Sequence, residues 1–166
     1  IRDLVNDLNL TMRLDCEMQA LRKEIIQPSA FLRQTAADFL NGGMGSGFDV
    51  EMELPETPLP EVKADPFLLR RAVNNLLSNC VRHNAAGCSI RLGARAEGKE
   101  LLLWVEGGGA EGALRPDASQ TLEPDGGAAH GTGLRLVAQI AAAHGGKAEF
   151  YSGTPYRCEL RLPVKQ

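Results

Sequence analysis

Apolar positions recur at helical spacing in one central stretch of the chain, residues 65–84. At about 100° per residue, one side of the predicted helix is apolar throughout. That side carries Leu69, Ala72, Val73, Leu76, Leu77 and Cys80. Asp65 is a suitable N-cap, and Pro66 suits the first helical turn. The pattern therefore predicts a long helix with one buried side.

A polar stripe runs beside the apolar side of this helix. It carries Asn75 and Asn79, followed by Arg82 and His83. Asparagine is unfavourable inside a helix because its amide competes for backbone groups, so two of them one turn apart need a reason. One interpretation is the solvated edge of an ordinary amphipathic helix. The other is a site where the amides hold a hydrated cation and the basic residues meet an anion.

Shorter patterns on both sides of this helix predict strands and two further helices. Residues 21–27 and 48–54 alternate as half-buried strands do. Pro28 begins a helix that ends at Asn41-Gly42-Gly43, and residues 55–60 are a proline-rich connector. Two hairpins follow, and their strands are residues 89–96 with 100–105 and residues 147–151 with 156–162.

A glycine-rich segment, residues 107–129, has no periodicity and is predicted to be a long loop of the kind that forms lids. After it, Gly131-Thr132-Gly133 opens an apolar-striped helix, and His144-Gly145-Gly146 ends that helix with a C′ glycine. Glycines at a helix N-terminus let backbone N–H groups point at a phosphate. The alternative for the glycines is a flexible loop that enters a helix.

Residues 1–18 carry apolar side chains at positions 1, 4, 5, 8, 12 and 18. This stripe predicts a helix that packs on another helix or on a second copy of itself. An N-terminal helix docked on its own domain is the alternative. Because the chain begins at Ile1 already in helical register, we expect it to be a fragment of a longer protein.

Composition narrows the functional classes. The 166 residues suit one domain with an appendage, and the net charge of −3 argues against a broad nucleic-acid surface. The four cysteines show no CxxC spacing, so we expect buried thiols in a reducing cytosol. No stretch is apolar for long enough to span a bilayer, and we expect neither a membrane span nor a signal peptide within these residues.

Two motifs together resemble the motifs of a known protein family. The run N-N-L-L-S-N-C-V-R-H-N is followed about fifty residues later by G-T-G-L-R-L and A-A-H-G-G. This combination resembles the catalytic, ATP-binding domain of sensor histidine kinases, within the gyrase–Hsp90–kinase–MutL ATPase superfamily. The resemblance implies an α/β (α+β) two-layer sandwich of the Bergerat type, with a mixed, mostly antiparallel sheet and helices on one face. Residues 1–20 would end a dimerisation helix, and 21–166 would form the ATP-binding domain with a lid at about 107–129.

The resemblance also implies roles for the polar stripe of the central helix. Asn79 matches the asparagine that ligates Mg²⁺, and its amide oxygen is a hard ligand suited to that cation. Asn75 matches a companion asparagine near the phosphates. Arg82 stands where the family places a basic residue on the phosphates. His83 would contact nucleotide or phosphate, although a histidine at a helix end is also a common cap on free carbonyls.

The glycine motifs complete the implied nucleotide site, with departures from the family pattern: Gly107 replaces an aspartate, Glu111 and Arg135 each replace a glycine, and the phenylalanine-bearing lid motif is missing. Backbone amides of Gly131, Thr132, Gly133 and Leu134 would cap the phosphates. The family usually carries D-x-G-x-G after its fifth strand, but after the predicted strand 100–105 this chain reads G-G-G-A-E from Gly107. Gly109 matches the first motif glycine, whereas Gly107 stands where the adenine-reading aspartate belongs. Glu106 would not replace it, because strand alternation points residue 106 to the opposite face.

The function implied is delivery of the ATP γ-phosphate to a histidine upstream of this fragment, since the box around the phosphoacceptor histidine is absent here. Cofactors would be ATP and Mg²⁺. Partners would be the protein's own dimerisation domain in a homodimer and a response regulator, with no nucleic acid. The whole protein would be a membrane-anchored bacterial sensor with this part in the cytoplasm. One alternative is a pseudokinase scaffold of the same fold that binds ATP weakly or not at all. The other, a chaperone- or topoisomerase-type ATPase, is disfavoured because Asn75 cannot act as a base.

Overall fold

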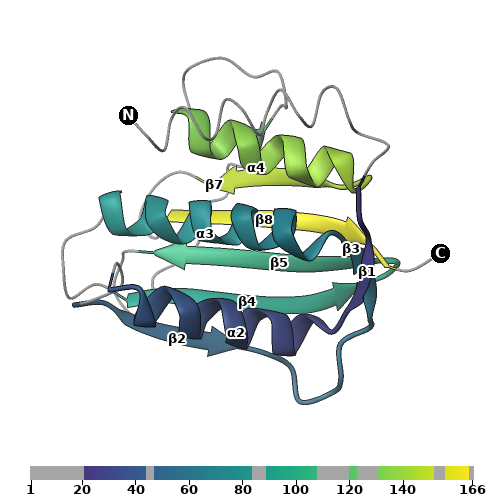
Figure 1. Cartoon of the computed structure of the whole chain (residues 1–166), viewed down its shortest axis with the longest axis horizontal. Helices are drawn as coiled ribbons and strands as arrows, with labels where there is room; N and C mark the ends of the chain where they lie inside the picture. Colours follow the sequence, from purple (N-terminus) through teal and green to yellow (C-terminus); the bar gives the residue numbers. More distant parts are fainter. Residues whose placement is uncertain are drawn as a thin grey trace.

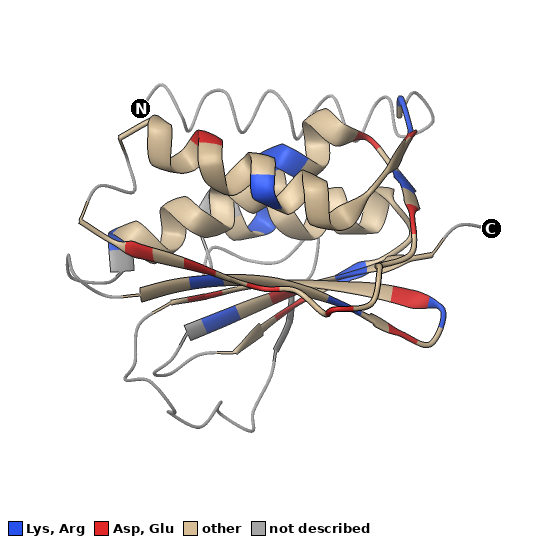
Figure 2. Cartoon of the chain, turned by 90° about the horizontal axis from the view of Figure 1, so that it is seen from below, with Lys and Arg blue, Asp and Glu red and all other residues tan. Residues whose placement is uncertain are grey.

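A computed structural model gives the structure of residues 21–43, 47–83, 89–107, 120–122, 131–151 and 156–164. The helix predicted over residues 1–18 lies outside these ranges. Within them, the helices form one layer over one face of a six-stranded sheet, as Figures 1 and 2 show from two directions. The helices are α2 (Pro28–Asn41), α3 (Pro66–His83) and α4 (Gly131–Ala143). The fold is therefore a two-layer sandwich.

The six-stranded sheet is mixed and mostly antiparallel, as expected. Its strands are β2 (Asp49–Glu53), β4 (Ser89–Glu97), β5 (Glu100–Gly107), β8 (Tyr156–Pro163), β7 (Lys147–Tyr151) and β6 (Gln120–Leu122), in that spatial order. β2 pairs with β4 in parallel, and every other neighbouring pair is antiparallel. The two predicted hairpins are confirmed as β4–β5 and β7–β8. Gly98, the first residue of the two-residue loop between β4 and β5, has φ +59°, a conformation that glycine adopts without strain.

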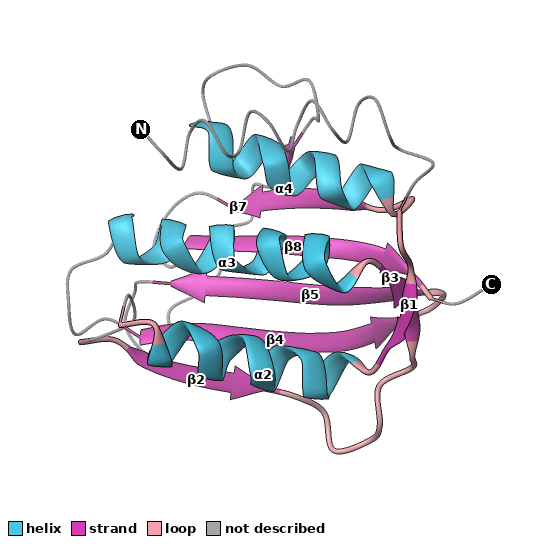
Figure 3. Ribbon diagram, in the orientation of Figure 1, coloured by secondary structure: helices cyan, strands magenta, loops and turns pink. Residues whose placement is uncertain are grey.

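The core lies between the helix layer and the inner face of the sheet. Figure 3 shows the helices in front of the strands that they cover. The predicted apolar side of α3 is confirmed, because all six of its side chains are at most 1% exposed. They pack with alternate residues of the central strand β5, namely Leu101, Leu103 and Val105. Full burial of a side chain of this size stabilises the fold by roughly 1.5–3 kcal/mol. The buried side of α3 thus fixes which of its side chains remain on the polar stripe.

Two short strands correct the sequence-based prediction. β3 (Val62–Ala64) lies in the connector between the prolines and α3, and it pairs with β1 (Glu24–Ile26) in an antiparallel two-stranded sheet. β6 lies inside segment 107–129, which was predicted to be a loop, and it pairs with β7. Both strands have three residues, too few for a periodic pattern, and their partners are far away in sequence. The prediction of a continuous loop was wrong at residues 120–122 and at Gly107, which belongs to β5.

No helix in the described part of the chain is long and apolar enough to cross a membrane. The expectation of buried thiols is confirmed for Cys80 and Cys158, which are buried and form no disulfide. Cys16 and Cys88 lie outside the described residues.

Candidate nucleotide site

The start of α3 is fixed by its predicted cap. Oδ1 of Asp65 accepts hydrogen bonds from the backbone N–H groups of Phe67, at 3.0 Å, and Leu68, at 3.2 Å. These bonds satisfy two of the donors that a helix N-terminus leaves unpaired. With its start and its buried side both fixed, α3 holds the polar stripe in one orientation along its whole length.

A buried histidine sets the relative direction of α3 and α4. Nε2 of His144, just after α4, accepts a hydrogen bond from the backbone N–H of Asp65, just before α3, at 2.9 Å. The end of α4 therefore lies beside the start of α3, and the two helices run antiparallel (Figure 1). Their other ends, the last turns of α3 and the first turn of α4, lie together. This arrangement brings Asn79 and Arg82 to the same end of the helix layer as the glycines that open α4.

The histidine–glycine motif ends α4 as the sequence predicts. The N–H of Gly146 bonds to the carbonyl oxygen of Ala141, and the N–H of Gly145 bonds to that of Ala142, each at 2.9 Å. Together with φ +78° at Gly145, these bonds form a Schellman motif with Gly145 at C′. The motif places His144 at the C-cap, where its ring contacts the last turn of the helix.

The strand end that should carry the base-reading residue lies at this same end of the molecule. β5 points toward the end of α3 in Figure 1, and it ends at Gly107. Gly107 is buried and lies between Ile90 and Tyr156 in the sheet. By strand alternation it shares the helix-facing side with Val105. Gly107 thus occupies the position expected of a base-reading residue but has no side chain to offer.

The polar stripe of α3 contains an unsatisfied donor. Nδ2 of Asn75 is buried and has no hydrogen-bond partner within the described part of the chain. Asn79 is 6% exposed, and its Oδ1 accepts a hydrogen bond from Nη2 of Arg82 at 3.0 Å. A buried amide donor without a partner is costly to a fold, which points to a ligand that completes it. Of the two interpretations of this stripe, these contacts favour a site over a solvated edge.

Other predicted site residues are placed less completely. His83 is the last residue of α3, and Gly131, Thr132 and Gly133 form the first turn of α4, but their side-chain surroundings lie outside the described residues. Leu134 is buried in the core at 5% exposure. Its contribution to a ligand would therefore come from its backbone. Gly109, the remaining predicted glycine, lies outside the described residues.

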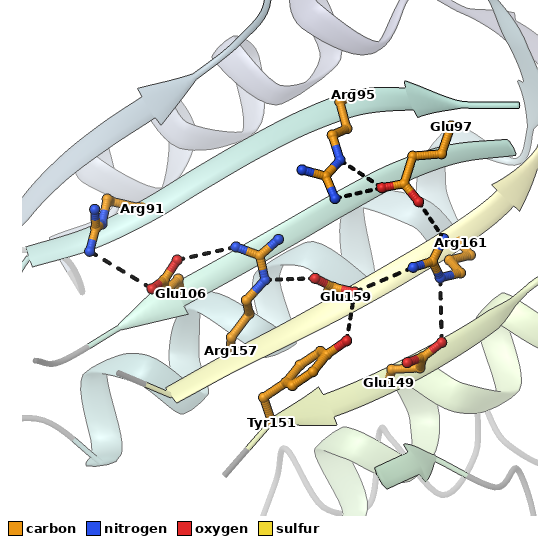
Figure 4. A network of polar contacts seen from close by, with 9 residues as sticks. All are labelled: Arg91, Arg95, Glu97, Glu106, Glu149, Tyr151, Arg157, Glu159 and Arg161. Atoms are coloured by element: carbon orange, nitrogen blue, oxygen red, sulfur yellow. Dashed lines mark hydrogen bonds and ion pairs between the residues drawn. The ribbon is translucent and has the colours of Figure 1, made fainter. Parts of the chain in front are cut away.

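The opposite face of the sheet carries an ionic network that the sequence analysis missed (Figure 4). Glu106 bonds to Arg157 at 3.2 Å, and Arg157 bonds to Glu159 at 2.7 Å. Glu159 is 1% exposed, and Arg157 also lies over the ring of Trp104, 4.7 Å from its centroid. The expectation that Glu106 points away from Gly107 is confirmed, because its carboxylate lies in this outer network. Glu106 therefore cannot read a base on the inner face.

The network extends to the far end of the sheet. Arg91 lies 3.8 Å from Glu106, and Arg161 donates to Glu97 at 2.9 Å. Hydrogen bonds from Arg161 and then from Arg95 hold the pKa of Glu97 below its usual value. The signal in the sequence was the alternation of charged and apolar residues along β4 and β8, where each charge faces outward. This network lies on the face of the sheet away from the helices, and its described residues contribute no group to the candidate site.

The groups at this site are suited to binding an anion and a hard cation. Burial, assisted by the charge of Glu106, raises the pKa of Cys80 to about 12, so this thiol is not a nucleophile at neutral pH. Among the described residues, no three His, Cys, Asp or Glu side chains lie close enough to hold a metal ion. The groups gathered here are amides, a guanidinium and the backbone N–H groups that open α4. Such groups bind phosphates, and an amide oxygen suits a magnesium ion that keeps most of its waters.

Fold and site together define a nucleotide-binding α/β sandwich. Residues 64–166 match the family described as "Histidine kinase-, DNA gyrase B-, and HSP90-like ATPase". The chain belongs to this family. It is 32% identical over 170 residues to the alginate biosynthesis sensor protein KinB of Pseudomonas aeruginosa, a match that covers 97% of this chain. The chain spans 28% of the length of that relative.

Solved structures share the fold. The histidine kinase AdeS of Acinetobacter baumannii has a TM-score of 0.73 at 19% identity, over 98% of this chain and 77% of that one. The ATP binding domain of PrrB from Mycobacterium tuberculosis has a TM-score of 0.62 at 24% identity, over 87% of this chain and 98% of that one. These likenesses confirm the predicted fold class and the predicted resemblance.

Proposed function

We propose that this chain is the ATP-binding catalytic domain of a sensor histidine kinase and that it presents the ATP γ-phosphate to a histidine on another segment of the whole protein. The observation that supports the proposal is that the end of α3, with the Asn75–Asn79–Arg82 stripe, and the first turn of α4 lie at the same end of the helix layer. An unsatisfied buried amide at Asn75 and a helix N-terminus at Gly131 are complementary to a polyphosphate.

Each group has a physical task in this proposal. The N–H groups of the first turn of α4 bind phosphate oxygens, and the helix dipole favours their negative charge. Arg82 neutralises phosphate charge, and Nδ2 of Asn75 donates a hydrogen bond. Oδ1 of Asn79 is the protein ligand of Mg²⁺, which shields the phosphates when it is bound. Phosphoryl transfer depends mainly on such positioning and charge neutralisation, so a general base in this domain is not needed.

The remaining components of the kinase reaction come from other parts of the whole protein and from its partners. We expect a homodimer formed through the segment that begins with residues 1–20, a phosphoacceptor histidine in that dimerisation domain, and a response regulator that takes the phosphoryl group. A domain that uses ATP belongs on the cytoplasmic side of a membrane-anchored sensor. None of the matched relatives is described as a scaffold without kinase activity, and nothing in the comparisons supports the pseudokinase alternative.

The test is calorimetric titration of this chain with ATP, with and without Mg²⁺. We expect binding that Mg²⁺ strengthens, and we expect Asn79→Ala to lose that gain. Asn74→Ala is the matched control, because Asn74 lies on the same helix but outside the stripe. For the full-length protein, radiolabelled ATP should give an acid-labile phosphorylated product. Absence of any ATP binding by the wild-type chain would refute the proposal and leave the scaffold alternative.

A further inference from the structure

The predicted magnesium ligand is engaged by a cation when no nucleotide is present. Nη2 of Arg82 lies 3.0 Å from Oδ1 of Asn79, the same oxygen that the proposed function gives to Mg²⁺. A magnesium ion would sit about 2.0–2.1 Å from that oxygen. The guanidinium and the ion would then share one acceptor at a separation where two positive charges repel strongly. The guanidinium therefore disfavours metal binding at this oxygen in the free form of the site.

The two partners differ in how easily they move. Asn79 is 6% exposed, whereas Arg82 is exposed and lies in the last turn of the helix. Among the described residues, Asn79 is the one hydrogen-bonding partner found for Arg82, and no carboxylate there forms an ion pair with it. Because an amide oxygen is a neutral acceptor, a phosphate oxygen competes with it successfully for a guanidinium.

We infer that Arg82 exchanges partners when a polyphosphate enters, leaving Oδ1 of Asn79 for the phosphates and so exposing the magnesium-binding atom. This inference rests on the proposed function and adds an order of events to it. Arg82 is a positioning residue that makes metal binding conditional on nucleotide. Mg²⁺ and ATP then strengthen one another's binding, and part of that coupling resides in one hydrogen bond.

The inference makes an unusual prediction for ATP without metal. Asn79→Ala removes the partner that Arg82 must leave, so metal-free ATP should bind about three- to tenfold more tightly to this variant than to the wild type. Mg²⁺, which strengthens ATP binding to the wild type, should give the variant no further gain. Backbone amide shifts of α3 in EDTA, followed by NMR, measure this binding even in the millimolar range.

Two variants identify the cause. Asn74→Ala removes an amide from the same helix without touching Arg82, so it should bind metal-free ATP as the wild type does. In an Arg82→Gln background, Asn79→Ala should no longer strengthen metal-free binding, because there is no Arg82 guanidinium for the substitution to release. A gain that persists in that background would overturn the inference, as would equal or weaker metal-free binding by Asn79→Ala alone.

A second readout does not depend on adenine. The side-chain amide signals of Asn79 in the free chain should shift in Arg82→Gln, and inorganic tripolyphosphate in EDTA should shift them in the same direction. If the wild type binds Mg²⁺-ATP but these signals ignore both changes, the inference fails and the proposed function stands. If the wild type binds no ATP, the proposed function fails, and signals that also ignore tripolyphosphate overturn the inference independently.

Discussion

Nε2 of His144 accepts a hydrogen bond from the backbone N–H of Asp65 at 2.9 Å, across 79 residues of sequence. Its Nδ1 lies 2.7 Å from the carbonyl oxygen of Ile140. Nδ1 therefore carries the proton and Nε2 is the acceptor, so the ring is neutral in this arrangement. A single imidazole thus joins the end of α4 to the start of α3 and holds the two helices that carry the candidate site.

This contact predicts a pH-dependent stability. Burial lowers the pKa of His144 below 6.5, against smaller opposing effects of the Ile140 carbonyl and the charge of Asp65, while Lys23 lowers it further. The unfolded chain therefore binds the proton more readily than the folded chain. Stability contributed by the neutral ring is present above pH 6.5 and is lost as the pH falls through the folded-state pKa.

We expect the free energy of unfolding to decrease by about 1 kcal/mol more in the wild type than in His144→Gln between pH 7.5 and 5.5. Glutamine offers an acceptor at a similar position but does not titrate there. Urea unfolding at both pH values measures the difference, and comparing the variants cancels the other titrating groups. Equal pH dependence of the two proteins would show that His144 is not the responsible group.

The outer network makes a second prediction. Arg157→Met removes the cation between Glu106 and Glu159 and leaves two buried carboxylates with weaker partners. We expect a loss of about 3 kcal/mol in the free energy of unfolding. The matched control is Arg95→Met, because Arg95 pairs with Glu97 near the surface with half of its side chain exposed. That substitution should cost less than about 1 kcal/mol in the same chemical denaturation experiment.

The sequence predicted the long elements and the helix ends because their signals are local. The apolar side of α3 repeats over 18 residues, and Asp65-Pro66 and Gly145-Gly146 mark helix ends through bonds to near neighbours. β3 and β6 escaped prediction because a three-residue strand is defined by a partner elsewhere in the chain. The outer network had a visible signal in its alternating charges. Its pairings depend on strand register across β5 and β8, which no local pattern gives.

The candidate site also has features that local sequence predicts and features that it does not. The stripe of Asn75, Asn79 and Arg82 follows from helical spacing, and its proximity to Gly131 follows from the antiparallel packing of α3 and α4. The bond between Arg82 and Asn79 depends on the rotamers of two side chains, and the bond from Asp65 to His144 depends on tertiary packing. Neither contact could be predicted from residue types.

Gly93 provides a third prediction, because the chain's single tryptophan lies across it. A Cβ atom on Gly93 would lie 2.1 Å from Cζ2 of Trp104 and 2.7 Å from the carbonyl oxygen of Glu53. Gly93→Ala should therefore displace the ring and cost about 1–3 kcal/mol, with tryptophan emission shifted to longer wavelength. Gly42→Ala is the control: its φ is −75°, its closest contact is 3.3 Å, and its effect should stay within about 1 kcal/mol. An unshifted emission spectrum in Gly93→Ala would contradict this packing.

The final prediction concerns Gly107, where the family resemblance implies an aspartate that reads adenine. Gly107 is not among the described glycines with positive φ, and it is paired as an extended residue at the end of β5. An aspartate there would avoid the strain of a left-handed conformation. Strand alternation would direct its carboxylate to the helix-facing side, where Val105 also points.

Without that carboxylate, the wild type lacks one hydrogen bond to a charged acceptor, which is worth roughly 1.5–3 kcal/mol or about one to two decades in affinity. We expect the wild type to bind ATP weakly and to distinguish ATP poorly from GTP, and we expect Gly107→Asp to bind ATP more tightly and to prefer it. Calorimetric titration of both proteins with each nucleotide and Mg²⁺ measures this. Gly107→Asn is the matched control, because it adds similar volume without the charge and should recover less. Tight, adenine-selective binding by the wild type would mean that another group reads the base.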